Sequence, residues 1–230
     1  MKIIDAHSHI SYISHDFQSE IIGTIVCTTN ESEWDNLINI LYNDKNVFGA
    51  FGIHPWFADS VDIQFESRLE FLLKNNPTYM IGEIGLDKNK PNMKNQIDIF
   101  QKQFDIAVKL KRMVFIHCVG AWDKFLYILK QYKKSSLPII IFHAFNGNND
   151  IIKYLIKNYA NNIYFSFGKN VLYGRNYGIT QIPENKILVE TDGKQDVLLK
   201  DVLDKICQIK NNLNMPDIIY NNTQRVLKNE

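Results

Sequence analysis

The sequence has few cysteines and no long apolar run, and both absences exclude classes of protein. Its three cysteines, Cys27, Cys118 and Cys207, are widely spaced and form no Cys-X-X-Cys pair. Scattered cysteines in odd number argue against a disulfide framework and favour a reducing compartment. No run approaches the ~20 apolar residues of a membrane helix, and MKIIDAHSHI lacks the apolar core of a signal peptide. We therefore expect a cytoplasmic protein that makes no membrane contact.

An excess of charge of either sign is also missing. The 230 residues include 26 Lys and Arg against 25 Asp and Glu, a net charge of +1. The protein has no overall positive charge of the kind that attracts nucleic acid, although local lysines beside a metal site could still hold a phosphate. The 45% hydrophobic content excludes a largely disordered chain. Nothing indicates a protein partner, so a monomer is the simplest expectation.

Short apolar runs alternate with amphipathic stretches along the whole chain. Eight runs rich in Ile, Val and Phe have the near-continuous apolar character of parallel strands covered on both faces. These runs are Lys2–Ala6, Ile21–Thr29, Val47–Ile53, Tyr79–Leu86, Met113–Val119, Leu137–Phe145, Asn162–Gly168 and Lys186–Gly193. Eight strands, most followed by a helix, predict an α/β fold, a (β/α)8 TIM barrel forming a single domain over residues 1–230. A doubly wound open sheet is the alternative.

Helical patterns separate most of these runs. They cover residues 32–43, 65–75, 95–111, 121–134 and 149–159, and two more close the chain after residue 193. The stretch Leu172–Pro183 is weakly periodic and contains two glycines and a proline, so it predicts an irregular loop.

Five of the six histidines close or follow an apolar run, and two carboxylates do the same. In a barrel these positions are the carboxyl ends of strands, where the loops that build active sites begin. The residues are His7, His9, His54, Glu83, His117, His143 and Asp192, whereas His15 falls in a loop. Any one of these histidines could be a core residue bonded to a backbone carbonyl. So many polar groups at the mouth of one apolar core would be costly without compensation.

Divalent cations are the natural compensation for such a group. His with Asp or Glu suits zinc, iron or manganese, and more carboxylate and water would favour magnesium. These residues offer more ligands than one tetrahedral ion needs, so two ions bridged by a carboxylate are expected. Two-metal sites with ions ~3.5–4 Å apart hydrolyse phosphate or acyl esters.

The ordered motifs resemble those of the TatD family of metal-dependent deoxyribonucleases. They are DAHSHI, GIHPW, GEIGLD, the glutamine-rich NQIDIFQKQFDIA, FIHC, FHAFNG, VETDG and NNTQRVL, and they cover nearly the whole chain in order. The resemblance implies a (β/α)8 fold of the amidohydrolase type and divalent-metal hydrolysis of DNA phosphodiesters. By the family pattern, one ion (Zn, Mg or Mn) would be held by His7, His9, Glu83 and Asp192. A second would be held by Glu83, His117 and His143, with Glu83 bridging.

The chain departs from the family pattern in three places. The residues after His117 are CVGAW rather than Ser-Arg-Glu-Ala, and VETDGKQD lacks the proline of the family's Glu-Thr-Asp-Ala-Pro-Tyr. The segment after Asp192 is abbreviated. The ligand set is kept while the substrate-facing loops differ, so hydrolysis is better supported than the choice of DNA.

The hypothetical reaction uses a water whose pKa a bound ion lowers to ~7. Asp192 is predicted to accept the proton of this water. The alternative is that it only binds the metal ion and transfers no proton. Glu83 is the second predicted catalytic residue because it bridges the ions. His54 is predicted to contact the substrate; the alternative is packing beside Pro55 and Trp56.

Other residues near these motifs carry open alternatives. Asp5 could orient an imidazole or be a satisfied buried carboxylate, and Asn30 could face the site or cap a helix. Trp122 could stack a base but is expected to pack against the barrel, and Cys118 is expected to be a small core residue. Loop lysines that could meet phosphates or be merely solvated are Lys88, Lys90 and Lys194.

Two functions compete with a DNase. Amide or ester hydrolysis on the same type of barrel is one, for example deacylation of mischarged aminoacyl-tRNA, because fold alone cannot choose the substrate. A non-catalytic, metal-stabilised interaction scaffold is the other, and it predicts a missing ligand that the sequence does not show.

Overall fold

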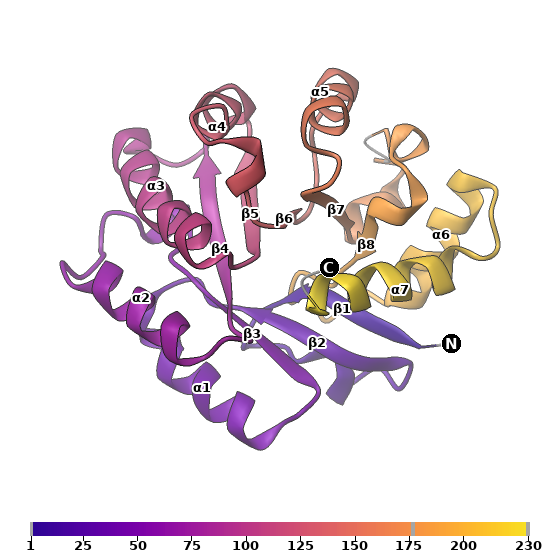
Figure 1. Cartoon of the computed structure of the whole chain (residues 1–230). Helices are drawn as coiled ribbons and strands as arrows, with labels where there is room; N and C mark the ends of the chain where they lie inside the picture. Colours follow the sequence, from indigo (N-terminus) through magenta and orange to yellow (C-terminus); the bar gives the residue numbers. More distant parts are fainter. Residues whose placement is uncertain (1, 176–177, 229–230) are drawn as a thin grey trace. The chain divides into compact units, whose positions relative to one another are not determined.

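The computed structural model describes residues 2–175 and 178–228 (Figure 1). It contains one eight-stranded sheet in the order β1-β2-β3-β4-β5-β6-β7-β8. The chain divides into two compact units: Met1–Val26 with Ile141–Glu230, called unit 1, and Cys27–Ile140, called unit 2. The prediction of a single domain over residues 1–230 stays a prediction.

Unit 1 places the last strand beside the first. The backbone N–H of Asp192 donates to the carbonyl of His7 at 3.0 Å, which joins the ends of β8 and β1. Helix α7 packs on both strands, and α6 lies beside α7 (Figure 1). Its elements are β1 (Ile3–Ser8), β2 (Ile21–Cys27, whose last residue belongs to unit 2), α5 (Asn149–Tyr159), β7 (Ile163–Phe167), β8 (Ile187–Val189), α6 (Leu199–Lys210) and α7 (Met215–Lys228). The short strand β6 (Ile140–Phe142) lies at the boundary between the units.

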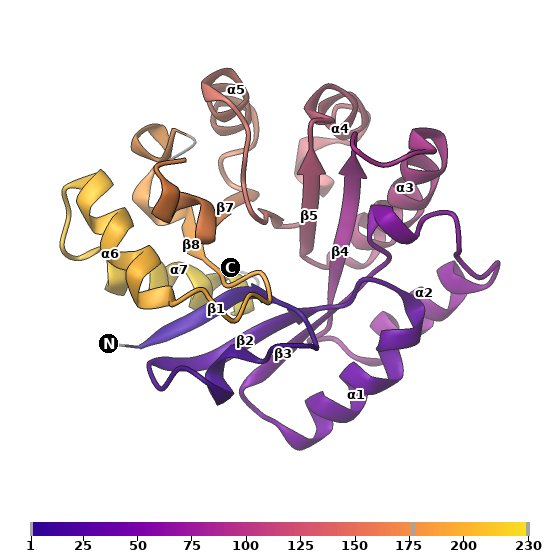
Figure 2. The same ribbon diagram turned by 180° about the vertical axis from the view of Figure 1, so that it is seen from behind.

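Unit 2 is a run of alternating helices and strands. Strand β4 pairs in parallel with β3 and with β5. In Figure 2, β4 and β5 stand side by side, and α3 and α4 lie next to them. All eight residues of β4 are buried, which explains why its sequence shows no polar alternation. The elements are α1 (Trp34–Asn43), β3 (Val47–Phe51), α2 (Phe65–Asn75), β4 (Met80–Asp87), α3 (Met93–Leu110), β5 (Val114–Val119) and α4 (Trp122–Leu129).

All eight predicted strands are present, and the predicted helices differ mainly at one end. Helix α4 stops at Leu129 rather than residue 134; of residues 130–135 only Tyr132 is half-buried, against Phe104, and the others are exposed. The connection from β1 to β2 has only a short 3-10 turn, η1 (Ser14–Asp16). The predicted loop Leu172–Pro183 is irregular and carries 3-10 turns, with residues 176–177 outside the described residues.

None of the helices in the described segments is both long enough and apolar enough to cross a bilayer.

Candidate metal centre

Two predicted histidine ligands of unit 1 converge on the carboxylate of Asp192. His7 is fully buried at the end of β1, and His9 follows one residue past that strand. The Nε2 atoms of His7 and His9 lie 3.9 and 3.6 Å from Oδ1 of Asp192, which follows β8. Their ligand atoms lie within 4.8 Å of one another, close enough to hold a metal ion. The two imidazoles of DAHSHI therefore approach the same carboxylate oxygen.

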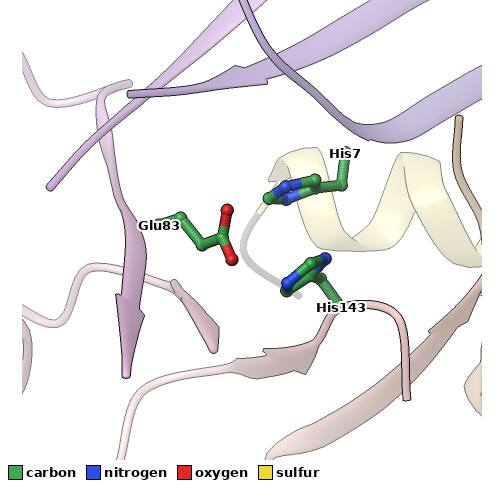
Figure 3. Close-up of side chains that lie close together, drawn as sticks. All are labelled: His7, Glu83 and His143. Atoms are coloured by element: carbon green, nitrogen blue, oxygen red, sulfur yellow. The ribbon is translucent and has the colours of Figure 1, made fainter. Parts of the chain in front are cut away.

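His143 joins the same group from the end of β6. Its ring stacks on that of His7 (Figure 3). The ring centroids are 4.2 Å apart and the planes are 20° apart. Its Nδ1 lies 4.0 Å from Oδ1 of Asp192 and 3.4 Å from Oε1 of Glu190. Figure 3 also draws Glu83, which belongs to β4 in unit 2.

The electrostatics of this group keep Asp192 ionised. Burial raises the pKa of its carboxyl, but a hydrogen bond from His9 and the charges of His143 and His7 outweigh burial and hold the pKa below the usual range. Lys194 forms an ion pair with the other carboxylate oxygen. An ionised carboxylate among three imidazoles is a donor set that fits a divalent cation.

The backbone around Asp192 is unusual. Asp192 has φ of 57° and Gly193 has φ of 64°, whereas Ala144, next to His143, has φ of 40°. Left-handed conformations are unfavourable for residues with a Cβ and persist where surrounding contacts impose them. Glu190 supplies one such contact, because its Oε1 accepts the N–H of Ala144 at 2.6 Å. Glu190 thereby fixes the turn that presents His143.

Asp5 on β1 links this strand to the segment that follows β8. Its Oδ1 accepts the backbone N–H groups of His7 at 3.2 Å and Thr191 at 3.0 Å, and its Oδ2 accepts the Thr191 hydroxyl at 2.6 Å. Burial raises the pKa of Asp5 to about 7, against the hydrogen bonds of Thr191, Ser14 and the backbone. Asp5 is therefore a satisfied buried carboxylate bonded to the main chain of His7, rather than to its imidazole.

A second group forms in unit 2 around Glu83, which is 2% exposed in the middle of β4. Its Oε1 lies 2.8 Å from Nδ1 of His117 on β5 and 3.3 Å from Nε2 of His54. Nε2 of His117 lies 3.4 Å from Oδ2 of Asp87, so this ring lies between two carboxylates. The hydrogen bond with His117 holds the pKa of Asp87 below its usual range. His54, Glu83 and His117 offer ligand atoms within 4.8 Å of one another.

The tautomer of His54 distinguishes it from the other two residues. Its Nδ1 accepts the backbone N–H of Trp56 at 3.2 Å, so the neutral ring carries its proton on Nε2, which faces Glu83. A protonated Nε2 donates a hydrogen bond and has no lone pair for a metal. The chemistry therefore favours Glu83 and His117 as ligands, with His54 as a donor toward a carboxylate or a phosphate oxygen.

A glycine allows β4 and β5 to approach closely beside His117. Gly85 pairs with His117, and a Cβ on Gly85 would lie 1.9 Å from the carbonyl oxygen of His117. The φ of Gly85 is 150°, which side chains rarely allow. The GEIGLD motif thus combines the buried Glu83 with the glycine that its neighbouring strand requires.

Two buried glutamines of α3 fix the backbone on either side of this group. Gln103 pairs with both main-chain groups of Ile53, accepting its N–H at 2.7 Å and donating to its carbonyl at 3.1 Å. Gln96 does the same for Asp87, at 2.8 and 3.2 Å, and donates to Pro91 at 2.9 Å. The two residues are seven apart, so they share one face of the helix. This accounts for two of the three glutamines of the NQIDIFQKQFDIA motif.

Several alternatives left open by the sequence are decided by these contacts. The side chain of Asn30 accepts the N–H of Ser32 and caps the turn that leads into α1. Trp122 is buried and packs edge-on against Phe125, so it is a packing residue as expected. Cys118 is buried, and burial raises the pKa of its thiol, as expected for a core residue.

The loop lysines differ from one another. The Nζ of Lys90 lies 4.1 Å from the ring centroid of Trp56, and Lys194 pairs with Asp192. Lys88 is exposed. Contact of these lysines with phosphate stays a prediction.

Sequence reasoning missed two carboxylates that adjoin the predicted ligands. Glu190 lies two residues before Asp192, and Asp87 ends the GEIGLD motif. Their positions at the ends of β8 and β4 were a usable signal, because Glu83 and Asp192 were selected on that ground. Their partners, Ala144 and Trp56, come from distant segments that no local pattern connects to them.

A cavity of ≈ 560 Å³ lies in unit 2. Its lining includes Ile53 and Phe57, on either side of the His54–Trp56 turn, together with Arg68. This volume falls in the range of small-ligand sites.

The family model described as TatD related DNase matches residues 4–228, which is nearly the whole chain. The chain belongs to the TatD-related DNase family. The expected resemblance is confirmed, and with it the assignment to a family of hydrolases that act on ester bonds.

Curated relatives of this TatD-family chain are named as nucleases. "3'-5' RNA nuclease TATDN2" of Homo sapiens is 31% identical over 85% of this chain, but the match spans only 26% of that protein. "3'-5' ssDNA/RNA exonuclease TatD" of Enterobacter lignolyticus is 24% identical over 81% of this chain and 73% of its own length. This chain therefore corresponds to about a quarter of the human protein and about three quarters of the bacterial one.

Among solved structures, the TatD homologue YJJV of Escherichia coli has the same fold. It aligns with a TM-score of 0.85 over 98% of this chain and 97% of its own, at 20% identity. The predicted (β/α)8 barrel is confirmed for this TatD-family member, and the open doubly wound sheet is excluded.

Proposed function

We propose that this chain is a divalent-metal-dependent nuclease that hydrolyses phosphodiester bonds of single-stranded nucleic acid. The observation that carries the proposal is that each unit gathers its own histidine–carboxylate group, in a chain whose family and named relatives are nucleases. DNA was the substrate implied by the sequence motifs, and the relatives' names extend the proposal to RNA. The aminoacyl-ester alternative lacks a comparable observation.

We assign the ligands by unit. His7, His9 and Asp192 would hold one ion, with His143 beside them, whereas Glu83 and His117 would hold a second. Bridging of two ions by Glu83 remains part of the proposal and is not needed for either group alone. A bound divalent ion would lower the pKa of a water and neutralise charge on the phosphate.

The side chains then have distinct roles. Asp192, ionised at neutral pH, would hold a cation and accept a proton from the attacking water. Glu83, the second catalytic residue of the proposal, orients both His54 and His117 through Oε1. His54 would donate its Nε2 proton to a phosphate oxygen, because Nδ1 is engaged by the backbone of Trp56.

Metal content tests the assignment directly. Purified protein reloaded with Zn, Mn or Mg should bind two ions, His9→Ala should lose one, and His117→Ala should lose the other. Glu83→Gln should lose both ions if it bridges and one if it serves a single site. One ion in the wild type, or two in both histidine variants, would contradict the assignment.

Activity tests the substrate. Labelled single-stranded DNA, single-stranded RNA and aminoacyl-tRNA are incubated with the loaded protein, with and without chelator. We expect cleavage of the first two and loss of cleavage with chelator. Deacylation without nucleic-acid cleavage would select the alternative function. Asp192→Asn with an unchanged rate and pH profile would remove Asp192 from the reaction.

A further inference from the structure

The turn after His54 exposes a large aromatic side chain beside the candidate site. Trp56 lies in the 3-10 turn η3 (Pro55–Phe57) and is 55% exposed, whereas Trp34 and Trp122 are 3% and 9% exposed. Exposing so much apolar surface is unfavourable, at about 25 cal/mol for each Å² left in water. A fixed, exposed tryptophan at such a site suits a ligand that covers it.

The ring is held in place rather than free to fold back. Its Nε1–H donates to Oδ2 of Asp87 at 2.7 Å, and its own backbone N–H donates to His54. Its ring is nearly perpendicular to that of His54, with centroids 5.2 Å apart. Because Pro55 also restricts the backbone of the turn, the ring pays little conformational entropy on binding a ligand.

The same residues connect Trp56 to the reacting groups. Oδ2 of Asp87 lies 3.4 Å from Nε2 of His117, and Nε2 of His54 lies 3.3 Å from Oε1 of Glu83. Trp56 is therefore one hydrogen-bonded residue away from a proposed metal ligand. If a base stacks on this ring, the neighbouring phosphodiester bond of the substrate would lie near Glu83 and His117.

A cation over the ring indicates the chemistry of that ligand. The Nζ of Lys90 lies over the ring, 4.1 Å from its centroid, and Lys90 is exposed. Proteins bind single-stranded nucleic acid with an aromatic ring and a nearby lysine, so an arriving base would take the place of the ammonium on the ring and the ammonium would move to a phosphate.

We propose that Trp56 is a substrate-binding residue that stacks a nucleobase of the single-stranded substrate, while Lys90 contacts the adjoining phosphate. The identity of the ligand rests on the proposed nuclease function. The position of the platform rests only on contacts within unit 2.

The test measures binding in chelator, where no cleavage interferes. Trp56 is the exposed tryptophan of the three, so a short oligothymidylate should quench intrinsic fluorescence of the wild type. An oligomer of abasic deoxyribose phosphate of the same length should quench much less. In Trp56→Phe the oligothymidylate should cause no quenching, because the remaining tryptophans are buried.

Affinities for a labelled oligothymidylate then separate stacking from the bond to Asp87. Trp56→Leu should weaken binding about tenfold or more, the loss expected for one base–aromatic stack. Trp56→Phe, which keeps a ring but loses the N–H, should stay within about threefold of the wild type. Phe71→Ala, which removes a 71% exposed aromatic from α2, is the matched control and should not change affinity.

The possible results distinguish a failure of the stacking role from a failure of the proposed nuclease function. Equal quenching by the abasic oligomer, equal losses in the Phe and Leu variants, or no loss in either would overturn the stacking role. Cleavage without quenching would leave the nuclease intact and remove Trp56 from it. Quenching of the wild type and a tenfold loss of affinity in Trp56→Leu, without cleavage by any metal-loaded form, would keep Trp56 as a stacking residue and remove the nuclease function.

Discussion

Replacing Gln103 by Leu tests how α3 supports the candidate site. Gln103 is fully buried and satisfies both the N–H and the carbonyl of Ile53, the residue before His54. Leucine has nearly the same volume but no polar atoms. The substitution should therefore leave little cavity while it removes the partners of two buried main-chain groups.

The magnitude follows from those two groups. Each buried donor or acceptor left without a partner costs about 1–3 kcal/mol, so the two together predict a loss of about 2–6 kcal/mol. For a chain of this size, each kcal/mol lowers the melting temperature by about 2–4 °C. A shift of at least about 4 °C is therefore expected.

The assay is urea unfolding followed by circular dichroism, with a thermal melt beside it. Gln101→Leu is the matched control, because Gln101 is half-buried on the same helix, and its effect should stay within about 0.5 kcal/mol. If Gln103→Leu is no less stable than this control, the bonds to Ile53 do not hold the segment and the reasoning is refuted. Metal-loaded Gln103→Leu that remains folded should also cleave more slowly, because the position of His54 depends on Ile53.

Three further substitutions test other contacts. Asp5→Ala should cost about 2–4 kcal/mol in urea unfolding, because it leaves Thr191 without its acceptor in a buried place; an unchanged midpoint would contradict this. Gly85→Ala should yield little folded protein, since its Cβ would lie 1.9 Å from a carbonyl oxygen. Gly174→Ala meets nothing within 4 Å but has φ of 78°, so it should cost about 1–2 kcal/mol and still fold. Hydrogen bonds from Lys109 and Lys74 lower the pKa of Glu70, so its stabilisation is complete above its ordinary pKa of 4.5 and is lost at lower pH. Glu70→Gln should therefore cost at most about 1 kcal/mol at pH 7, and the difference from wild type should vanish toward pH 3.

The sequence predicted the strands well because burial on both faces leaves a direct trace in composition. Strand β4 is buried along its whole length, and its run of apolar residues was recognisable without knowledge of its neighbours. The end of α4 was predicted less well, since residues 130–134 keep helical propensity although all but Tyr132 are exposed. Propensity alone does not mark where packing stops.

The candidate ligands were predictable because polar residues at strand ends stand out against apolar runs. His7 with Asp192 and Glu83 with His117 were found in this way, and each pair is close in space. Glu83 and His117 nevertheless lie inside β4 and β5 rather than at the strand ends where the apolar runs placed them. The supporting contacts were not predictable. That Gln103 bonds to Ile53 follows from the packing of α3 against a loop fifty residues away, for which the sequence has no periodic signal.

The two glutamines of α3 also constrain which changes the gene can tolerate in that helix. Gln96 and Gln103 reach two different loops from one stripe of the helix surface, separated by nearly two full turns. Adding or deleting one amino acid between them would rotate one side chain by about 100° relative to the other, so that only one loop could still be held. Substitutions on the outward stripe leave this spacing intact. Length variation should consequently be confined to the ends of α3, whereas its solvent-facing positions are open to drift.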